Sequence, residues 1–479
     1  MAKLKLAVIG DSLTQGFQSG AISKTTWSFP AILARAFGVE VPGEFLVPSF
    51  PGPGLPLNVE DLLRQLELRT GPKTDAATLG RVLTSIPSYL DELEDLYERG
   101  VGSRPPKFSG VYSNLAVWGF ALADALRLTP MRSRRAIEES EGWIEDDFLG
   151  LPSGPMYRTA QRVLNPGDES ERRGETQLDA LERCVRSQGG VDAVIVWLGA
   201  NDALGTVLTL DVRDMERVSA DALPSDPVAL LKWNLTSKAR FEEDYRQIVA
   251  RVSDIVRAHS PGAAVFVATI PYVTIPPITR GVGRLQGKHF DHYRRFFVKS
   301  DSGASPLEGL TRDDVELIEA RIDGFNALIR SEALARGFHV VEVAKMLDLL
   351  AVRRNGKEDA PDKPLRDFLG DAEHPLLRLT PVPNILMYEL DANGARAQGG
   401  LFSLDGVHPS TAGYGLIAEE FLKTMRAAGV PDAERARIPW AAVIANDSLL
   451  QHPPRLWQPL LDQAEQHATL WGLLARALA

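Results

Sequence analysis

The chain has 479 residues, of which 44% are hydrophobic and 24% are charged, and its formal net charge is −10. This composition is typical of a globular protein with a large core, and the negative charge argues against a nucleic-acid binder that depends on a general positive field. The single cysteine, Cys184, excludes a disulfide-built scaffold, and we expect a cytoplasmic protein because neither an apolar leader nor a transmembrane run is seen.

The first predicted element is an apolar run at residues 4–9, which stops at Gly10. A short run of this kind indicates a buried parallel strand. Asp11, Ser12 and Thr14 follow it directly, so they would lie at the carboxyl edge of the sheet, where open α/β sheets bind ligands. Ser12 is therefore a candidate nucleophile, provided that a base and an oxyanion hole come from elsewhere in the chain.

Strands and helices alternate along the rest of the chain. Apolar runs predict further strands over 111–119, 191–199, 263–270 and 338–343. Helical spacing predicts helices over 17–41, 59–99, 121–126, 238–258, 315–336 and 411–427, whereas 203–235 shows no regular pattern. The alternation indicates an α/β fold: a doubly wound sheet of five parallel strands with helices on both faces, in three α/β/α layers.

Long segments interrupt this pattern after the strand ends, where connecting loops tolerate insertions. We expect one α/β domain over 1–429 and a helical C-terminal extension over 430–479. The insertions in the domain are expected at about 42–107, 127–176, 272–312 and 344–403.

Two inserted stretches have a distinctive composition. The loop 42–56 is rich in proline and glycine, which makes it a candidate lid. The run Lys288–Phe297 interleaves basic and aromatic residues, which is typical of an amphipathic helix with a solvated face; a substrate entrance is the alternative. His289 and His292 have a ligand-like spacing, but no further cysteine or histidine pair accompanies them, so we expect no zinc site.

A candidate base for Ser12 comes near the end of the domain. His408 stands apart from the other histidines because Asp405 lies three residues before it, in a turn that leads into a predicted helix. Residues three apart are neighbours on a helical turn, so the carboxylate can take the Nδ1 proton and leave Nε2 facing Ser12. The structural alternatives are a helix-capping serine at Ser12 and a helix cap beside a structural histidine at Asp405 and His408.

An oxyanion hole needs fixed hydrogen-bond donors. The candidates are the backbone N–H groups of Ser12 and Gly119 and the side-chain amide of Asn201, each at the end of a predicted strand. Gly119 and Asn201 have the alternative role of simple turn residues. We expect Asp11 to brace the first turn and Asn114 to bond the loop around it.

Four short blocks carry a family resemblance: Gly10–Leu13, Asn114–Gly119, Gly199–Asp202 and Asp405–His408. With these blocks in this order, the chain resembles the SGNH hydrolases, also called GDSL esterases and lipases. The resemblance implies a flavodoxin-like sheet and ester hydrolysis without a metal or other cofactor. It also implies that Ser12 is the nucleophile, His408 the base and Asp405 its orienting acid, with an oxyanion hole made by Ser12, Gly119 and Asn201.

These features predict a serine hydrolase that cleaves a small-molecule carboxylic ester, such as a lipid or an acetylated sugar, through an acyl-Ser12 intermediate. One alternative is an acyltransferase that uses the same triad with an acceptor other than water. A non-catalytic binding module is the other. We expect no nucleic-acid partner, and the sequence leaves the acyl and alcohol specificity and the oligomeric state open.

Overall fold

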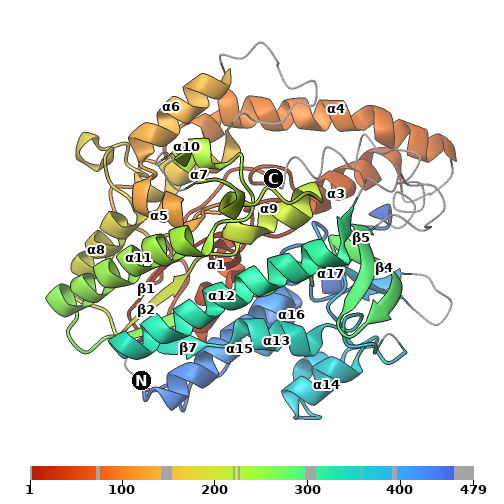
Figure 1. Ribbon diagram of the computed structural model, residues 1–479. Coiled ribbons are helices and arrows are strands. Elements are labelled where there is room, and N and C mark those ends of the chain that lie inside the picture. Colours follow the sequence, from red (N-terminus) through yellow and green to blue (C-terminus); the bar gives the residue numbers. More distant parts are fainter. Residues whose placement is uncertain are drawn as a thin grey trace.

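The computed structural model describes residues 3–71, 76–141, 154–219, 222–224, 227–296, 309–357, 359–390 and 396–457. A parallel sheet lies at the centre of this part of the chain, and helices surround it (Figure 1). Its strands follow the order β1-β2-β3-β7, and all neighbours are parallel. Their bounds are Leu6–Gly10 (β1), Ala193–Trp197 (β2), Ala264–Ala268 (β3) and His339–Val341 (β7).

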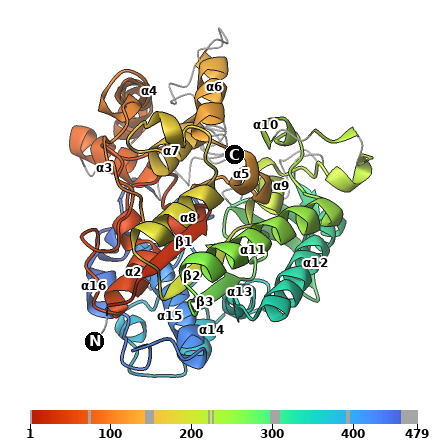
Figure 2. The ribbon, with the colours of Figure 1, turned by 90° about the vertical axis from the view of Figure 1, so that its left-hand side faces the viewer.

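Successive side chains of a strand point to opposite faces of the sheet, and here both sets are apolar. Helices therefore cover both faces. Val8 and Ile195 belong to one buried cluster, and Ile9 and Val196 belong to the other. Helices on the first face are α2 (Phe29–Ala36), α13 (Val343–Leu350) and α15 (Thr411–Ala427). Those on the second are α5 (Leu122–Arg127), α8 (Gln177–Ser187), α9 (Asn201–Thr209), α11 (Lys238–His259) and α12 (Arg312–Arg336), and α8 and α11 lie over β1 and β2 in Figure 2.

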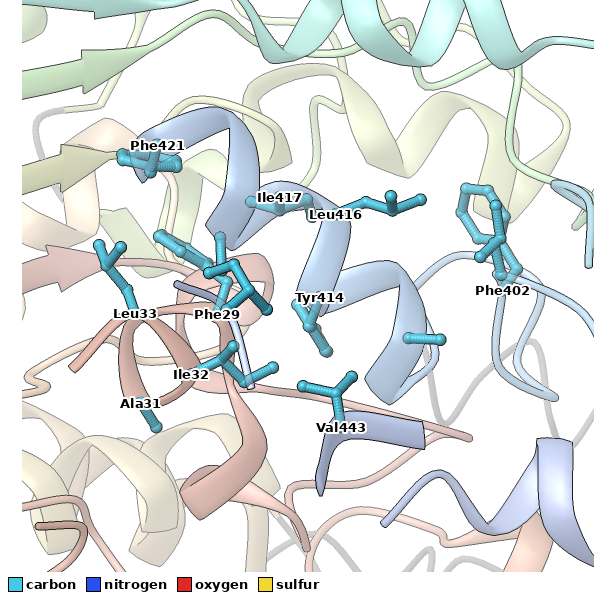
Figure 3. Packing of buried hydrophobic residues seen from close by; sticks show 14 of the residues in the cluster. Phe29, Ala31, Ile32, Leu33, Phe402, Tyr414, Leu416, Ile417, Phe421 and Val443 are labelled. Atoms are coloured by element: carbon cyan, nitrogen blue, oxygen red, sulfur yellow. The ribbon is translucent and has the colours of Figure 1, made fainter. Parts of the chain in front are cut away.

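The packing of α2 against α15 shows how the first face is filled. Phe29 stacks on Phe421 with ring centroids 4.6 Å apart, and Ile417 lies in the same cluster (Figure 3). Val443 of α16 (Trp440–Ala445) joins this cluster, and α17 (Ser448–Gln451) follows it in the chain. Residues 458–479 of the predicted C-terminal extension lie outside the described part, and the division at residue 430 stays a prediction.

Of the five predicted strands, the one over 111–119 is not confirmed. The segment runs beside β1, where Val8 N–H donates to Ser113 O at 2.9 Å and Val8 O accepts from Leu115 N–H at 2.9 Å. It forms only an isolated parallel bridge, between Val8 and Asn114. The Asn114 Oδ1 accepts from the N–H of Ala116 at 3.1 Å, and such local side-chain bonds compete with a regular ladder.

The prediction of an amphipathic helix over Lys288–Phe297 is wrong. The strand β5 (His289–Arg295) pairs there with β4 (Thr279–Gln286), and the short β6 (Leu310–Thr311) pairs with β5. Gly287, at φ 61°, lies in the tight turn between β4 and β5, a conformation that favours glycine and closes a hairpin. The helical prediction failed because composition did not reveal the partner strand.

Helices build much of the remaining chain. The predicted helix 59–99 is two helices, α3 (Val59–Thr70) and α4 (Ala76–Glu98), and 203–235 contains most of α9 although the sequence showed no regular pattern there. The other elements are α1 (Ser12–Gln15), α6 (Pro130–Glu141), α7 (Pro155–Leu164), α10 (Pro227–Leu230), α14 (Lys363–Leu369), β8 (Tyr388–Leu390) and β9 (Arg396–Gly399). None of the helices in the described ranges has the length and apolarity that crossing a membrane requires.

Candidate active site

Ser12 is the first residue of α1, directly after β1. The Asp11 side chain caps this short helix by accepting a hydrogen bond from Leu13 N–H at 3.0 Å. Gly16 ends it at φ 92°, in the left-handed region that favours glycine. The sharp turn places Ser12 at the carboxyl edge of the sheet.

Asp405 and His408 form a hydrogen-bonded pair. Asp405 Oδ2 accepts from His408 Nδ1 at 3.2 Å and from the backbone N–H of Gly20 at 2.9 Å. Asp405 Oδ1 accepts from the N–H groups of Val407 and His408, both at 2.8 Å. Burial raises the pKa of Asp405, but His408 and these backbone donors outweigh it and hold the pKa below its ordinary value. At neutral pH the carboxylate is therefore ionised and holds the imidazole through Nδ1.

The loop that follows Ser12 is bonded to the turn that carries His408. Ser19 N–H donates to Ser403 Oγ at 2.8 Å, beside the Gly20–Asp405 bond. The Phe17 ring lies 4.4 Å from the His408 ring, measured between centroids. These contacts bring the first and last sequence blocks together across almost the whole chain.

Ser12 and His408 line the same cavity, which encloses about 760 Å³ including its open mouth. Among the described residues, neither Ser12 Oγ nor His408 Nε2 has a hydrogen-bond partner, so the two groups are bonded neither to each other nor to a competing side chain. The rest of the wall is almost entirely apolar. Both groups are thus available to a ligand in this cavity.

The second and third blocks also meet near Ser12. Asn201 Nδ2 donates to Phe120 O at 3.0 Å, next to Gly119, and its second N–H stays free of protein acceptors among the described residues. Gly119 lies in a turn at φ 79°, where a Cβ atom would come within 2.8 Å of Met156 Sδ. Neither residue is among those that line the cavity, although Ala200, directly before Asn201, is.

Two buried carboxyl groups lie behind these turns. Burial, together with the neighbouring Asp202, raises the pKa of Asp11 to about 7. Burial raises the pKa of Asp202 to about 7 as well. Asp202 accepts from the Thr236 hydroxyl at 2.8 Å and from Leu122 N–H at 3.2 Å, so it joins the start of α9 to the loop after Gly119.

Asn114 and the two histidines of β5 lie away from the cavity. Asn114 Nδ2 donates to Thr14 O at 2.9 Å, which ties its segment to α1. His289 Nε2 lies 2.9 Å from Glu319 Oε2. The described ranges contain no group of three or more histidine, cysteine, aspartate or glutamate side chains that could hold a metal ion.

Sequence reasoning missed the apolar wall of the cavity. Its residues on α13 are Val343, Met346, Leu347 and Leu350, and others come from α15 and from two predicted insertions. Leu416 of α15 points toward Phe402, another wall residue (Figure 3). The helical spacing at 343–350 was a usable signal, but ordinary core packing has the same spacing. The candidate lid at 42–56 contributes no residue to this wall among the described residues.

The chain has a parallel sheet, and a cavity lies beside the carboxyl edge of that sheet. Open α/β proteins bind their ligands at this edge, so the chain belongs to that structural class. The model of the GDSL-like lipase/acylhydrolase family matches residues 88–421, and the chain belongs to this family. It is thereby placed in a general class of ester-hydrolysing enzymes. The matched range includes three of the four sequence blocks and begins after the block that contains Ser12.

Two further comparisons add nothing to this assignment. The crystal structure of phospholipase A1 from Streptomyces albidoflavus NA297 is 13% identical, with 88% of this chain and 100% of that chain covered and a TM-score of 0.32. A likeness this weak carries no argument about activity. Among the curated proteins, none matches this sequence.

Proposed function

We propose that the protein hydrolyses carboxylic esters with a long apolar acyl chain and that Ser12 is the nucleophile. The supporting observation is the cavity itself, in which Ser12 and His408 lie in a wall that is otherwise almost entirely apolar. His408 is held from behind by the buried, ionised Asp405. A nucleophile, a base and an orienting acid are the parts that acyl transfer to a serine needs.

In the proposed reaction, Ser12 Oγ attacks the ester carbonyl carbon while His408 Nε2 takes the hydroxyl proton. The carbonyl oxygen becomes negative and is stabilised by the N–H groups of Ser12 and Gly119 and by the Asn201 amide. The intermediate collapses as His408 gives its proton to the leaving alcohol, which leaves an acyl-Ser12. Water, deprotonated by His408, then releases the acid and restores Ser12.

The cavity wall supports a long acyl chain. The side chains that line it are almost all apolar and come from several elements, so an acetyl group would leave most of the wall uncovered. Burying one methylene group gains about 0.8 kcal/mol, so each added methylene should raise kcat/KM about fourfold until the cavity is filled. Lipid-like esters therefore suit this site better than acetylated sugars.

A series of p-nitrophenyl esters, from acetyl to palmitoyl, tests the proposal. Ser12→Ala should abolish hydrolysis and leave the melting temperature almost unchanged. Leu347→Trp should fill the cavity and shift the preference toward shorter chains, whereas Leu349→Trp on the exposed side of the same helix should not. Activity in Ser12→Ala removes the mechanism, and an unchanged profile in Leu347→Trp removes the acyl site. Measuring the released acid with added alcohols present separates hydrolysis from acyl transfer.

A further inference from the structure

A second cavity, of about 510 Å³, lies between α6, α7 and the loop after α4. Five arginines line it among the described residues, against a single carboxylate, Asp168. The arginines are Arg104, Arg134, Arg158, Arg162 and Arg173. This is a concentration of positive charge in a chain whose net charge is −10.

Arg162 gives the strongest indication of a ligand. Arg162 is only 8% exposed, and among the described residues no carboxylate lies within ion-pair distance of its guanidinium group. Its Nη2 donates to the carbonyl oxygens of Gly102 at 3.1 Å and Arg104 at 3.0 Å, which leaves Nε and Nη1 without a protein acceptor in that part of the chain. Burial lowers the pKa of Arg162. A buried guanidinium is normally paired with an anion.

Arg104, Arg134 and Arg173 have few carboxylate partners among the described residues. Asp168 is shared between Arg134, at 2.7 Å, and Arg173, at 3.6 Å. Arg104 is exposed and forms no ion pair with any described residue. Arg158 lies 3.7 Å from Glu98, at the edge of the group. In the described part of the chain, Arg104, Arg134, Arg162 and Arg173 therefore have one carboxylate, Asp168, between them. Planar guanidinium groups in a concave site suit the oxygens of a phosphoryl group.

We propose that this cavity binds a phosphoryl group, carried either by a soluble phosphate compound or by a lipid headgroup. Helix α7 connects this cavity to the proposed oxyanion hole. Met156, near its start, lies beside Gly119, and Arg162 follows six residues later on the same helix. Six residues of α-helix span about 9 Å along the axis. A phosphate bound at Arg162 therefore lies less than two helical turns from Met156, which is next to Gly119.

Calorimetric titration of the Ser12→Ala protein with inorganic phosphate and with glycerol 3-phosphate, at constant ionic strength, tests the proposal. Phosphatidylcholine vesicles with and without phosphatidic acid form the lipid arm. We expect binding in at least one arm. If the soluble phosphates bind, the ligand is a free phosphate compound; if only the vesicles with phosphatidic acid bind, the ligand is a lipid headgroup. Binding in neither arm overturns the proposal.

Variants test whether these residues form the site. Arg104→Gln and Arg173→Gln should each weaken binding about tenfold, because a hydrogen bond to a charged group is lost. Asp168→Asn should tighten it, since a competing carboxylate is removed, and asparagine tolerates the left-handed backbone at φ 52° there. Arg257→Gln, an exposed arginine on α11, is the matched control and should bind like the parent. Binding that is equal in all four variants overturns the assignment, and thermal unfolding checks that each is folded.

Discussion

Replacing Asp405 with asparagine separates the proposed role of this carboxylate from its role in stability. Asparagine has the same shape but only one acceptor oxygen, whereas Asp405 accepts four hydrogen bonds. If that oxygen keeps the N–H groups of Val407 and His408, the new NH₂ group faces Gly20 N–H and His408 Nδ1. The substitution therefore places a donor where two donors already point.

Two effects of known size follow. Gly20 N–H loses its buried acceptor, which costs about 1–3 kcal/mol. His408 Nδ1 must now accept from the asparagine, so the imidazole proton moves to Nε2 and the ring can no longer take the proton of Ser12. Loss of the correct tautomer lowers kcat about 10⁴-fold in a triad of this kind. We therefore expect Asp405→Asn to be folded, less stable and almost inactive.

The assay combines kcat on a p-nitrophenyl ester with urea unfolding at several pH values. Because the pKa of Asp405 is lowered on folding, its stabilisation is present above its ordinary value of 3.8 and is lost as the pH falls through the folded value. The variant should lack this acid-side loss. Asp447→Asn is the control, since Asp447 is equally buried and accepts from Ala412, Leu449 and Leu450 but does not line the cavity. A folded Asp405→Asn enzyme with parental kcat would refute the reasoning.

Three further substitutions test the surroundings of Ser12. Asn201→Ala should lower kcat about 10²–10³-fold with little change in KM, and steady-state kinetics that show an unchanged kcat would exclude it from the oxyanion hole. Gly119→Ala should lower both kcat and melting temperature, because its positive φ and the nearby Met156 disfavour a Cβ; a variant that unfolds and reacts like the parent would contradict this. Because the pKa of Asp202 is raised to about 7, its contribution to the free energy of unfolding is present below pH 3.8 and is lost as the pH rises through 7. Asp202→Asn should flatten the fall in unfolding free energy over that interval, and an equally steep fall measured with urea would argue against the shift.

Local signals explain why the long helices could be predicted. The predicted helix 315–336 is α12, which begins with a capping box formed by Thr311 and Asp314 and ends at Gly337 with φ 70°. Both ends are set by residues within a few positions of the helix. The hairpin at β5 was mispredicted because a strand depends on a partner that composition does not reveal.

The candidate site divides in the same way. The Asp405–His408 pair lies within one turn, so the spacing alone was enough to predict the contact that the structure contains. The Gly20–Asp405 bond joins residues 385 positions apart, and no pattern in the sequence indicates it. The wall residues of α13 were equally hidden, because an apolar side chain that lines a cavity has the same spacing as one that fills a core.

The proposed chemistry and the proposed specificity therefore depend on different parts of the chain. Ser12 is positioned by the end of β1, whereas most of α13 lies in the predicted insertion 344–403 and is bonded to its surroundings by several side chains, Arg354 and Lys288 among them. Arg354 Nε bonds Asp348 of α13 at 2.9 Å, and its Nη2 bonds Glu319 of α12 at 2.7 Å. Arg354 thus links the wall helix α13 to α12 through hydrogen bonds between charged groups. Changes in this cluster should consequently alter the preference for acyl-chain length and leave the turn that carries Ser12 unchanged.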